Sequence, residues 1–173
     1  TQRANRRNEL AIEAIGKISK QNIELVAPAI QMFLKMVESE DDDTKFRAIK
    51  GLGEVCVQRP GWAYMGINKL VEIASSEKDD SARMKALVEL SRIGKSNPTM
   101  LIEHKMPIIN ALKDSNKHVR RLAAWTIGSM AEAIPKEAQE ALPALRDALH
   151  DDYFLVRKFA DKALKLIRAA MRR

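Results

Sequence analysis

Residues that form tight turns, and aromatic residues, are scarce in this chain. Among its 173 residues there are 7 glycines and 6 prolines, and aromatic residues make up 5%. So few turn-forming residues argue against an all-β fold, which needs a turn between successive short strands. Hydrophobic residues still reach 46%, which is ample for a core. Because aromatic rings are rare, we expect an aliphatic core packed from helices.

Cysteines and long apolar runs are also scarce. Cys56 is the only cysteine, which excludes an internal disulfide and favours a reducing compartment. No stretch approaches the roughly 18 consecutive apolar residues that indicate a membrane span. The first residues lack the apolar segment of a signal peptide, and whether anything precedes Thr1 is left open. We therefore expect a cytoplasmic chain with no membrane association.

One sequence pattern returns along the chain. Its clearest copy runs from Val119 to Ala123 (Val-Arg-Arg-Leu-Ala), and a second copy runs from Val156 to Ala160. Aligning all copies places an alanine every 37 or 38 residues. We call these residues the register alanines: Ala11, Ala48, Ala86, Ala123 and Ala160. Self-similarity at a fixed period of this length indicates a stacked repeat protein.

Each repeat is predicted to contain two helices, with apolar residues at helical spacing in both. The helix pairs are expected at about 22–58, 61–96, 99–134 and 136–171, and an unpaired helix is expected at 3–20. Breaks such as Pro60-Gly61 separate successive pairs. Pro28, Pro107 and Pro143 fall inside first helices, where they should cause bends. The acidic run 38–43 is predicted to be a solvated loop, with Asp43 as the expected cap of the next helix.

These features resemble the HEAT repeat, and most closely the short HEAT-like repeats of phycobilisome lyases. The resemblance rests on an internal proline in the first helix, an Asp at the turn, then Val-Arg, Ala and Ile-Gly. It implies an all-α, right-handed α-solenoid of about four helix pairs plus a leading half repeat, as a single armadillo-like array over residues 1–173. In that family the Asp and Arg form a ladder between units. The positions that fit are Asp114, Asp151, Arg83, Arg120 and Arg157, whereas Lys45 and Asn8 depart from the pattern.

No group of residues indicates catalysis or a bound cofactor. His104, His118 and His150 show no metal-binding spacing. A diiron hydroxylase built from similar repeats needs His-Glu pairs, and no histidine here is followed by Glu. Cys56 lies at a small-residue position of its helix, so we expect a buried, inert thiol. The chain is therefore predicted to be non-enzymatic, with no metal and no cofactor.

Positive charge is concentrated in the predicted second helices. Those segments hold 22 basic and 6 acidic residues, whereas the rest of the chain holds 8 basic and 17 acidic residues. In solenoids of this family the second helices line the concave side, so we expect a positive concave face. Positions two before and two after the register alanines should point into it. The residues predicted to bind a partner there are Phe46, Lys50, Met84, Val88, Arg121, Trp125, Lys158 and Lys162.

Two classes of partner fit such a face. The first is a protein or peptide with acidic and apolar residues, bound by a scaffold or adaptor. The second is a nucleic acid with bases stacked on aromatic rings beside its phosphates, in the manner of the HEAT-like DNA glycosylases that this repeat also resembles. Trp125 is alternatively a packing wedge between second helices. The apolar edge of the leading helix at 3–20 suggests a third contact, self-association.

Overall fold

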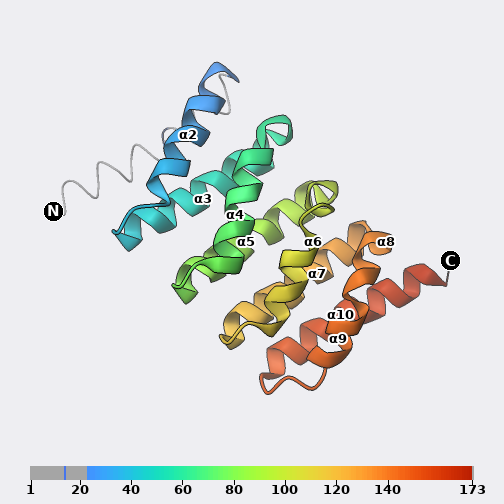
Figure 1. Ribbon diagram of the computed structural model, residues 1–173. Coiled ribbons are helices and arrows are strands. Elements are labelled where there is room, and N and C mark those ends of the chain that lie inside the picture. Colours follow the sequence, from blue (N-terminus) through green and yellow to red (C-terminus); the bar gives the residue numbers. More distant parts are fainter. Residues whose placement is uncertain (1–13, 15–22, 173) are drawn as a thin grey trace.

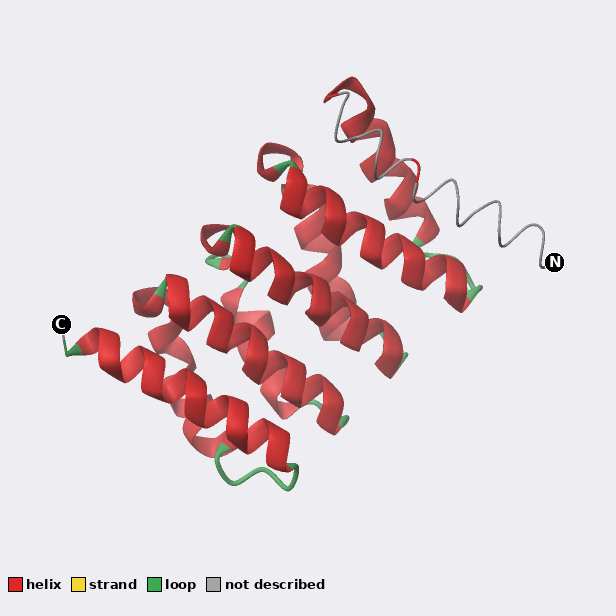
Figure 2. Ribbon diagram, turned by 180° about the vertical axis from the view of Figure 1, so that it is seen from behind, coloured by secondary structure: helices red, strands yellow, loops and turns green. Residues whose placement is uncertain are grey.

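The computed structural model describes Ala14 and residues 23–172, and all the regular structure in that part is helical (Figure 1). The second helices are long and unbroken: α3 (Asp42–Gln58), α5 (Asp80–Ser96), α7 (Lys117–Ala133) and α10 (Phe154–Met171). They lie side by side in one layer (Figure 2). This arrangement confirms the predicted all-helical solenoid. Apart from Ala14, the unpaired helix expected at 3–20 lies outside the described residues.

The first helices are shorter and more broken than the second. They comprise η1 (Ile23–Leu25) with α2 (Val26–Met36); η2 (Pro60–Trp62) with α4 (Tyr64–Ser76); η3 (Pro98–Leu101), α6 (Lys105–Asn110) and η4 (Ala111–Lys113); and α8 (Pro135–Ala138), η5 (Gln139–Ala141) and α9 (Leu142–Ala148). Pro28, Pro107 and Pro143 each lie within the first three residues of α2, α6 and α9. Proline lacks an amide donor, and the first turn of a helix is where that loss costs least. In the third and fourth pairs the first helix is divided into separate short segments, where the sequence predicted only a bend.

The core runs continuously between the two layers. Ala48, Ala86, Ala123 and Ala160 are fully buried. The larger apolar residues one turn later, such as Leu52 and Leu90, are fully buried as well. Small residues also let neighbouring second helices approach closely. A Cβ placed on Gly128 in α7 would already lie 3.9 Å from the Cβ of Ala163 in α10.

A side chain in the turn caps most of the second helices. Asp41 accepts a hydrogen bond from the Thr44 amide at 2.9 Å, and Asp79 accepts from the Ser81 amide at 2.9 Å. Asn116 does the same for α7. The expected cap at Asp43 is wrong. Asp43 lies inside the first turn of α3, where its carboxylate pairs instead with Arg47 one turn later.

Candidate partner-binding site

The predicted partner-binding residues all lie on second helices, and none is fully buried. Lys50, Lys158 and Lys162 are exposed. The other five are half-buried: Phe46, Met84, Val88, Arg121 and Trp125. We call these eight residues the second-helix face. Their exposure leaves them accessible to a partner, while the apolar members also pack against the core.

The best-defined feature of this face is a small cavity beside Trp125, which we call the Trp125 pocket. Its volume is about 60 Å³. The indole ring stacks on Phe159 of α10, with ring centroids 6.4 Å apart and planes 27° apart. The Nζ atom of Lys95 lies over the indole, 4.9 Å from its centroid. The remaining lining residues are Ala124, Gly128, Ser129, Glu132 and Lys162.

The Trp125 pocket shows that the two interpretations of Trp125 are not exclusive. The indole packs between α7 and α10, as a wedge would, because it stacks on Phe159. It also remains half-exposed and forms one wall of the cavity. Ala124 and Gly128, which carry little or no side chain, also line the cavity. A stacked aromatic pair above small residues is a shape into which an apolar side chain fits.

Two residues of this pocket were missed by the sequence analysis. Lys95 lies nine positions after Ala86, and Phe159 lies one position before Ala160. The positions two and nine residues after a register alanine are seven residues apart, which is about two helical turns. They therefore lie on the same face of the helix. Extending the search by two turns would have found Lys95.

A second cation lies over an aromatic ring of the second-helix face. Lys85 Nζ is 4.7 Å from the centroid of the Phe46 ring.

Part of the positive charge expected on this layer is neutralised. Lys162 Nζ binds Glu132 at 2.7 Å across the α7–α10 junction, and Lys165 binds Asp161 at 2.6 Å. In contrast, Lys50 interacts electrostatically with Glu89, and Lys158 has no carboxylate partner among the described residues. The buried Nε of Arg121 likewise finds no hydrogen-bond acceptor there. The second-helix face is therefore positive, but less so than its composition predicts.

An ion-pair network, in which only the Glu89 side chain is buried, lies between α3 and α5. Arg92 binds Glu89 at 2.6 Å and Glu54 at 3.1 Å. Burial raises the pKa of Glu89, and the charge of Arg92 opposes the shift. Gly53 makes room for this carboxylate, because a Cβ at that position would lie 2.2 Å from a Glu89 oxygen. The network joins two repeats at the middle of their second helices.

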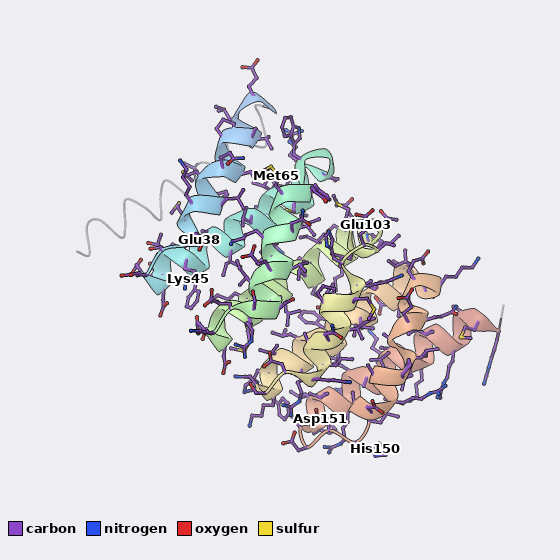
Figure 3. All side chains as sticks on the ribbon, in the orientation of Figure 1. Glu38, Lys45, Met65, Glu103, His150 and Asp151 are labelled. Carbon is purple, nitrogen blue, oxygen red and sulfur yellow. The ribbon has the colours of Figure 1, made fainter. Side chains whose placement is uncertain are left out.

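The Arg-Asp ladder implied by the HEAT resemblance is present at the two later junctions. Arg83 binds Asp114 through Nε and Nη2, both at 2.9 Å. Arg120 binds Asp151 in the same two-pronged way, at 2.7 and 3.0 Å. Hydrogen bonding to these carboxylates raises the pKa of each guanidinium. Lys45 (labelled in Figure 3) departs from this pattern, since no ion pair joins it to any described residue.

Cys56 and His118, which were considered above as catalytic or metal-binding residues, have contacts typical of structural residues. Cys56 is fully buried and donates to the Ala63 carbonyl at 3.5 Å. Burial raises the pKa of its thiol to about 12, so the nucleophilic thiolate is suppressed. His118 meets the ring of Tyr153 edge-on at 5.4 Å. Within residues 14 and 23–172, no three His, Cys, Asp or Glu side chains gather as metal ligands do, and no helix is apolar and long enough to cross a membrane.

The geometry defines a class: a helical solenoid whose last three helix pairs are joined by an arginine ladder and whose second helices present a shared face. A family model for HEAT repeats matches residues 67–165, and the chain belongs to this family. No curated protein sequence matches the chain.

Solved structures share the fold at low sequence identity. A designed armadillo repeat protein in complex with the peptide (KR)4 superimposes with a TM-score of 0.70 at 21% identity, covering 91% of this chain and 74% of that one. The complex of CpcE and CpcF of phycocyanin lyase from Nostoc sp. PCC7120 gives a TM-score of 0.63 at 16% identity, covering 89% and 98%. An engineered protein gives 0.66 at 18% identity, covering 92% and 72%.

Proposed function

We propose that this protein is a non-enzymatic scaffold whose second-helix face binds a protein or peptide carrying acidic and apolar residues. The Trp125 pocket is the observation that carries this proposal. Its aromatic wall fits an apolar side chain, and its lining includes Lys95 and the ion pair between Lys162 and Glu132. Aromatic residues surrounded by partly desolvated charged groups are typical of the residues that dominate binding energy at protein interfaces.

The packing of the layers supports the second helices as the concave side. Neighbouring second helices are much more closely packed against one another than neighbouring first helices are. In a curved array the inner layer is the more compact one, which agrees with that assignment. A concave face surrounds an extended partner and buries more of its surface than a flat face does.

The charge of the face favours an acidic partner. One similar solved structure, a designed armadillo repeat protein, has the basic peptide (KR)4 as its partner. Here the second-helix face presents cations instead, and Lys158 lacks a carboxylate partner among the described residues.

The same cations and rings would also accept a nucleic acid, but the carboxylates on this layer argue against it. Glu132 lies at the rim of the Trp125 pocket, and Glu54 and Glu89 line the α3–α5 junction. The two that are partly exposed, Glu132 and Glu54, would repel a phosphate backbone that tracks along the helices. A peptide can place a cationic or neutral residue opposite them. We therefore favour the protein or peptide partner.

A matched set of probes tests the proposal. The first probe is a capped peptide alternating Glu with Leu and Phe, the second has Lys in place of Glu, and the third is a single-stranded oligonucleotide. We expect only the first to bind the full chain in a fluorescence anisotropy titration. Trp125→Ala should weaken binding roughly tenfold, as loss of an aromatic anchor does. Trp62→Ala, on the first-helix layer, should leave binding unchanged.

Lys95→Gln provides a second test that does not disturb the α7–α10 packing. It should weaken the acidic peptide several-fold, whereas Lys136→Gln in α8 should have little effect. Binding of the oligonucleotide with an affinity that falls steeply with salt would favour the nucleic-acid alternative instead. If the acidic peptide binds wild type and Trp125→Ala equally, the second-helix face is not the binding surface.

A further inference from the structure

Three consecutive second helices carry an arginine three residues before the register alanine: Arg83, Arg120 and Arg157. Each guanidinium holds the turn that precedes its own helix. Nη1 of Arg120 donates to the carbonyls of Asp114 and Ser115, at 3.0 and 3.1 Å. Nη1 of Arg157 donates to the carbonyls of Asp151 and Asp152, at 2.7 and 3.1 Å. The third guanidinium is thus fixed in the same orientation as the other two.

The opposite edge of the guanidinium distinguishes Arg157 from the other two. Arg83 and Arg120 use Nε and Nη2 to bind an aspartate of the following repeat. Arg157 is half-buried near the start of α10, and no carboxylate among the described residues pairs with it. Its two carbonyl contacts already hold the Arg157 side chain in place. Most of the conformational entropy cost of ordering this side chain is therefore met before a carboxylate binds.

We propose that Arg157 is a preorganised carboxylate-binding site, whose occupant is an aspartate in an exposed turn of a partner polypeptide. The molecule shows twice how such a carboxylate is held, through two parallel N–H···O bonds to Nε and Nη2. Charge-assisted pairs of this geometry are among the strongest side-chain hydrogen bonds. This site lies at the start of α10, and it does not depend on what the second-helix face binds.

The outer surface of α10 indicates a turn, and not a further stacked helix pair, as the occupant. On α7 the residues that face the next helix include Ala124 and Gly128, which permit close packing. One repeat later, α10 has Asp161 and Lys165, an ion pair that is largely exposed to solvent. A helix packed as α10 packs on α7 would bury that pair at a cost in desolvation.

The neighbour of Arg157 specifies a second feature of the partner. At the α7–α10 junction, Asp151 binds the ladder arginine while Tyr153, two residues on, lies under Lys117 with Nζ 5.2 Å from its ring centroid. The position equivalent to Lys117 in the next repeat is Phe154. Phe154 is 59% exposed, and its ring centroid lies 6.0 Å from Cζ of Arg157. An aspartate followed two residues later by an aromatic residue would therefore place its ring on Phe154 while its carboxylate binds Arg157.

A peptide probe tests this site on the full chain. The probe is a doubly capped peptide with the sequence of residues 149–154, which contains Asp151 and Tyr153 in the required spacing. We expect it to shift the side-chain Nε–H resonance of Arg157 in a ¹⁵N-labelled NMR titration. The same peptide with asparagine in place of its first aspartate should bind roughly tenfold more weakly, because a charged hydrogen bond is lost.

Two protein variants separate this site from plain charge attraction. Arg157→Lys keeps the charge but loses the two-pronged geometry, so it should also bind roughly tenfold more weakly. Arg168→Gln removes a charge from the same helix and should change binding by less than about twofold. The proposal is overturned if the peptide causes no shift at Arg157, if both peptides bind equally, or if Arg157→Lys binds as wild type does.

Discussion

Two kinds of junction join neighbouring repeats in this molecule. At the α5–α7 and α7–α10 junctions, an arginine at the start of one second helix binds an aspartate in the next turn. At the α3–α5 junction, Lys45 stands where that arginine would be, and the ion pairs lie at mid-helix, around Glu89 and Arg92. The comparison teaches that one repeat geometry can be stabilised at the turn or along the helix. The two solutions should respond differently to mutation and to acid.

Removing an aspartate from the ladder should have the largest effect. The Asp151 side chain is only 9% exposed and holds Arg120 by two bonds. Asp151→Ala leaves a mostly buried guanidinium with only the exposed Asp152 beside it. We expect a loss of about 3 kcal/mol in the free energy of unfolding, measured by urea denaturation. Asp152→Ala is the matched control, because that side chain is 84% exposed and should matter little. Equal losses in both variants would contradict a ladder held by Asp151.

Filling the space beside Glu89 should have a smaller effect, on the other junction. In Gly53→Ala the new methyl group would overlap the Glu89 side chain, whose atoms lie 2.2–2.6 Å from where that methyl carbon would be. The carboxylate must move away from its position between the helices. We expect a loss of about 2 kcal/mol, measured in the same way. Gly61→Ala is the control, since nothing lies within 4 Å of a Cβ there. An unchanged stability in Gly53→Ala would show that Glu89 moves freely.

The ladder junctions were predictable from sequence, and the mid-helix junction was not. The ladder repeats with the register alanines, so Arg120 and Asp151 appear at fixed positions in a family pattern. Gly53, Glu89 and Arg92 occur once, and nothing in the repeat marks them as neighbours. Their contact depends on the angle at which α3 meets α5, which only the packed structure defines.

The Trp125 pocket was only partly predictable from the sequence. The position of Trp125 on the second-helix face followed from its place two residues after Ala123. The partner Phe159 belongs to the next helix, and its ring reaches Trp125 only because small residues bring α7 and α10 together. The pairing of Lys162 with Glu132 is likewise a contact between helices. A count of charges along the chain therefore overestimates the positive charge of the face.

Acid should affect the two kinds of junction in opposite directions. Burial raises the pKa of Glu89 above the ordinary value of 4.5, so the folded state takes up a proton more readily than the unfolded state does. This contribution to stability is present below pH 4.5 and is lost as the pH rises through the folded pKa. For Asp151, burial opposes ionisation, but hydrogen bonds from Arg120 and the Tyr153 amide outweigh it and hold the pKa below 3.8. Its contribution is present above pH 3.8 and is lost as the pH falls through the folded pKa.

Replacing each carboxyl group by its amide isolates these opposite contributions. We expect Glu89→Gln to lose stability relative to wild type as the pH is lowered from 7 towards 4, because only the wild type gains from protonation of Glu89. Asp151→Asn should gain relative to wild type below pH 3.8, because the wild type is then losing its ladder carboxylate. Urea denaturation at a series of pH values from 7 to below 3.8 measures both differences. The sign of each slope of stability difference against pH depends only on whether folding raises or lowers the pKa of the replaced group. If the two stability differences, each taken relative to wild type, change in the same direction with pH, the two junctions do not differ in their electrostatics.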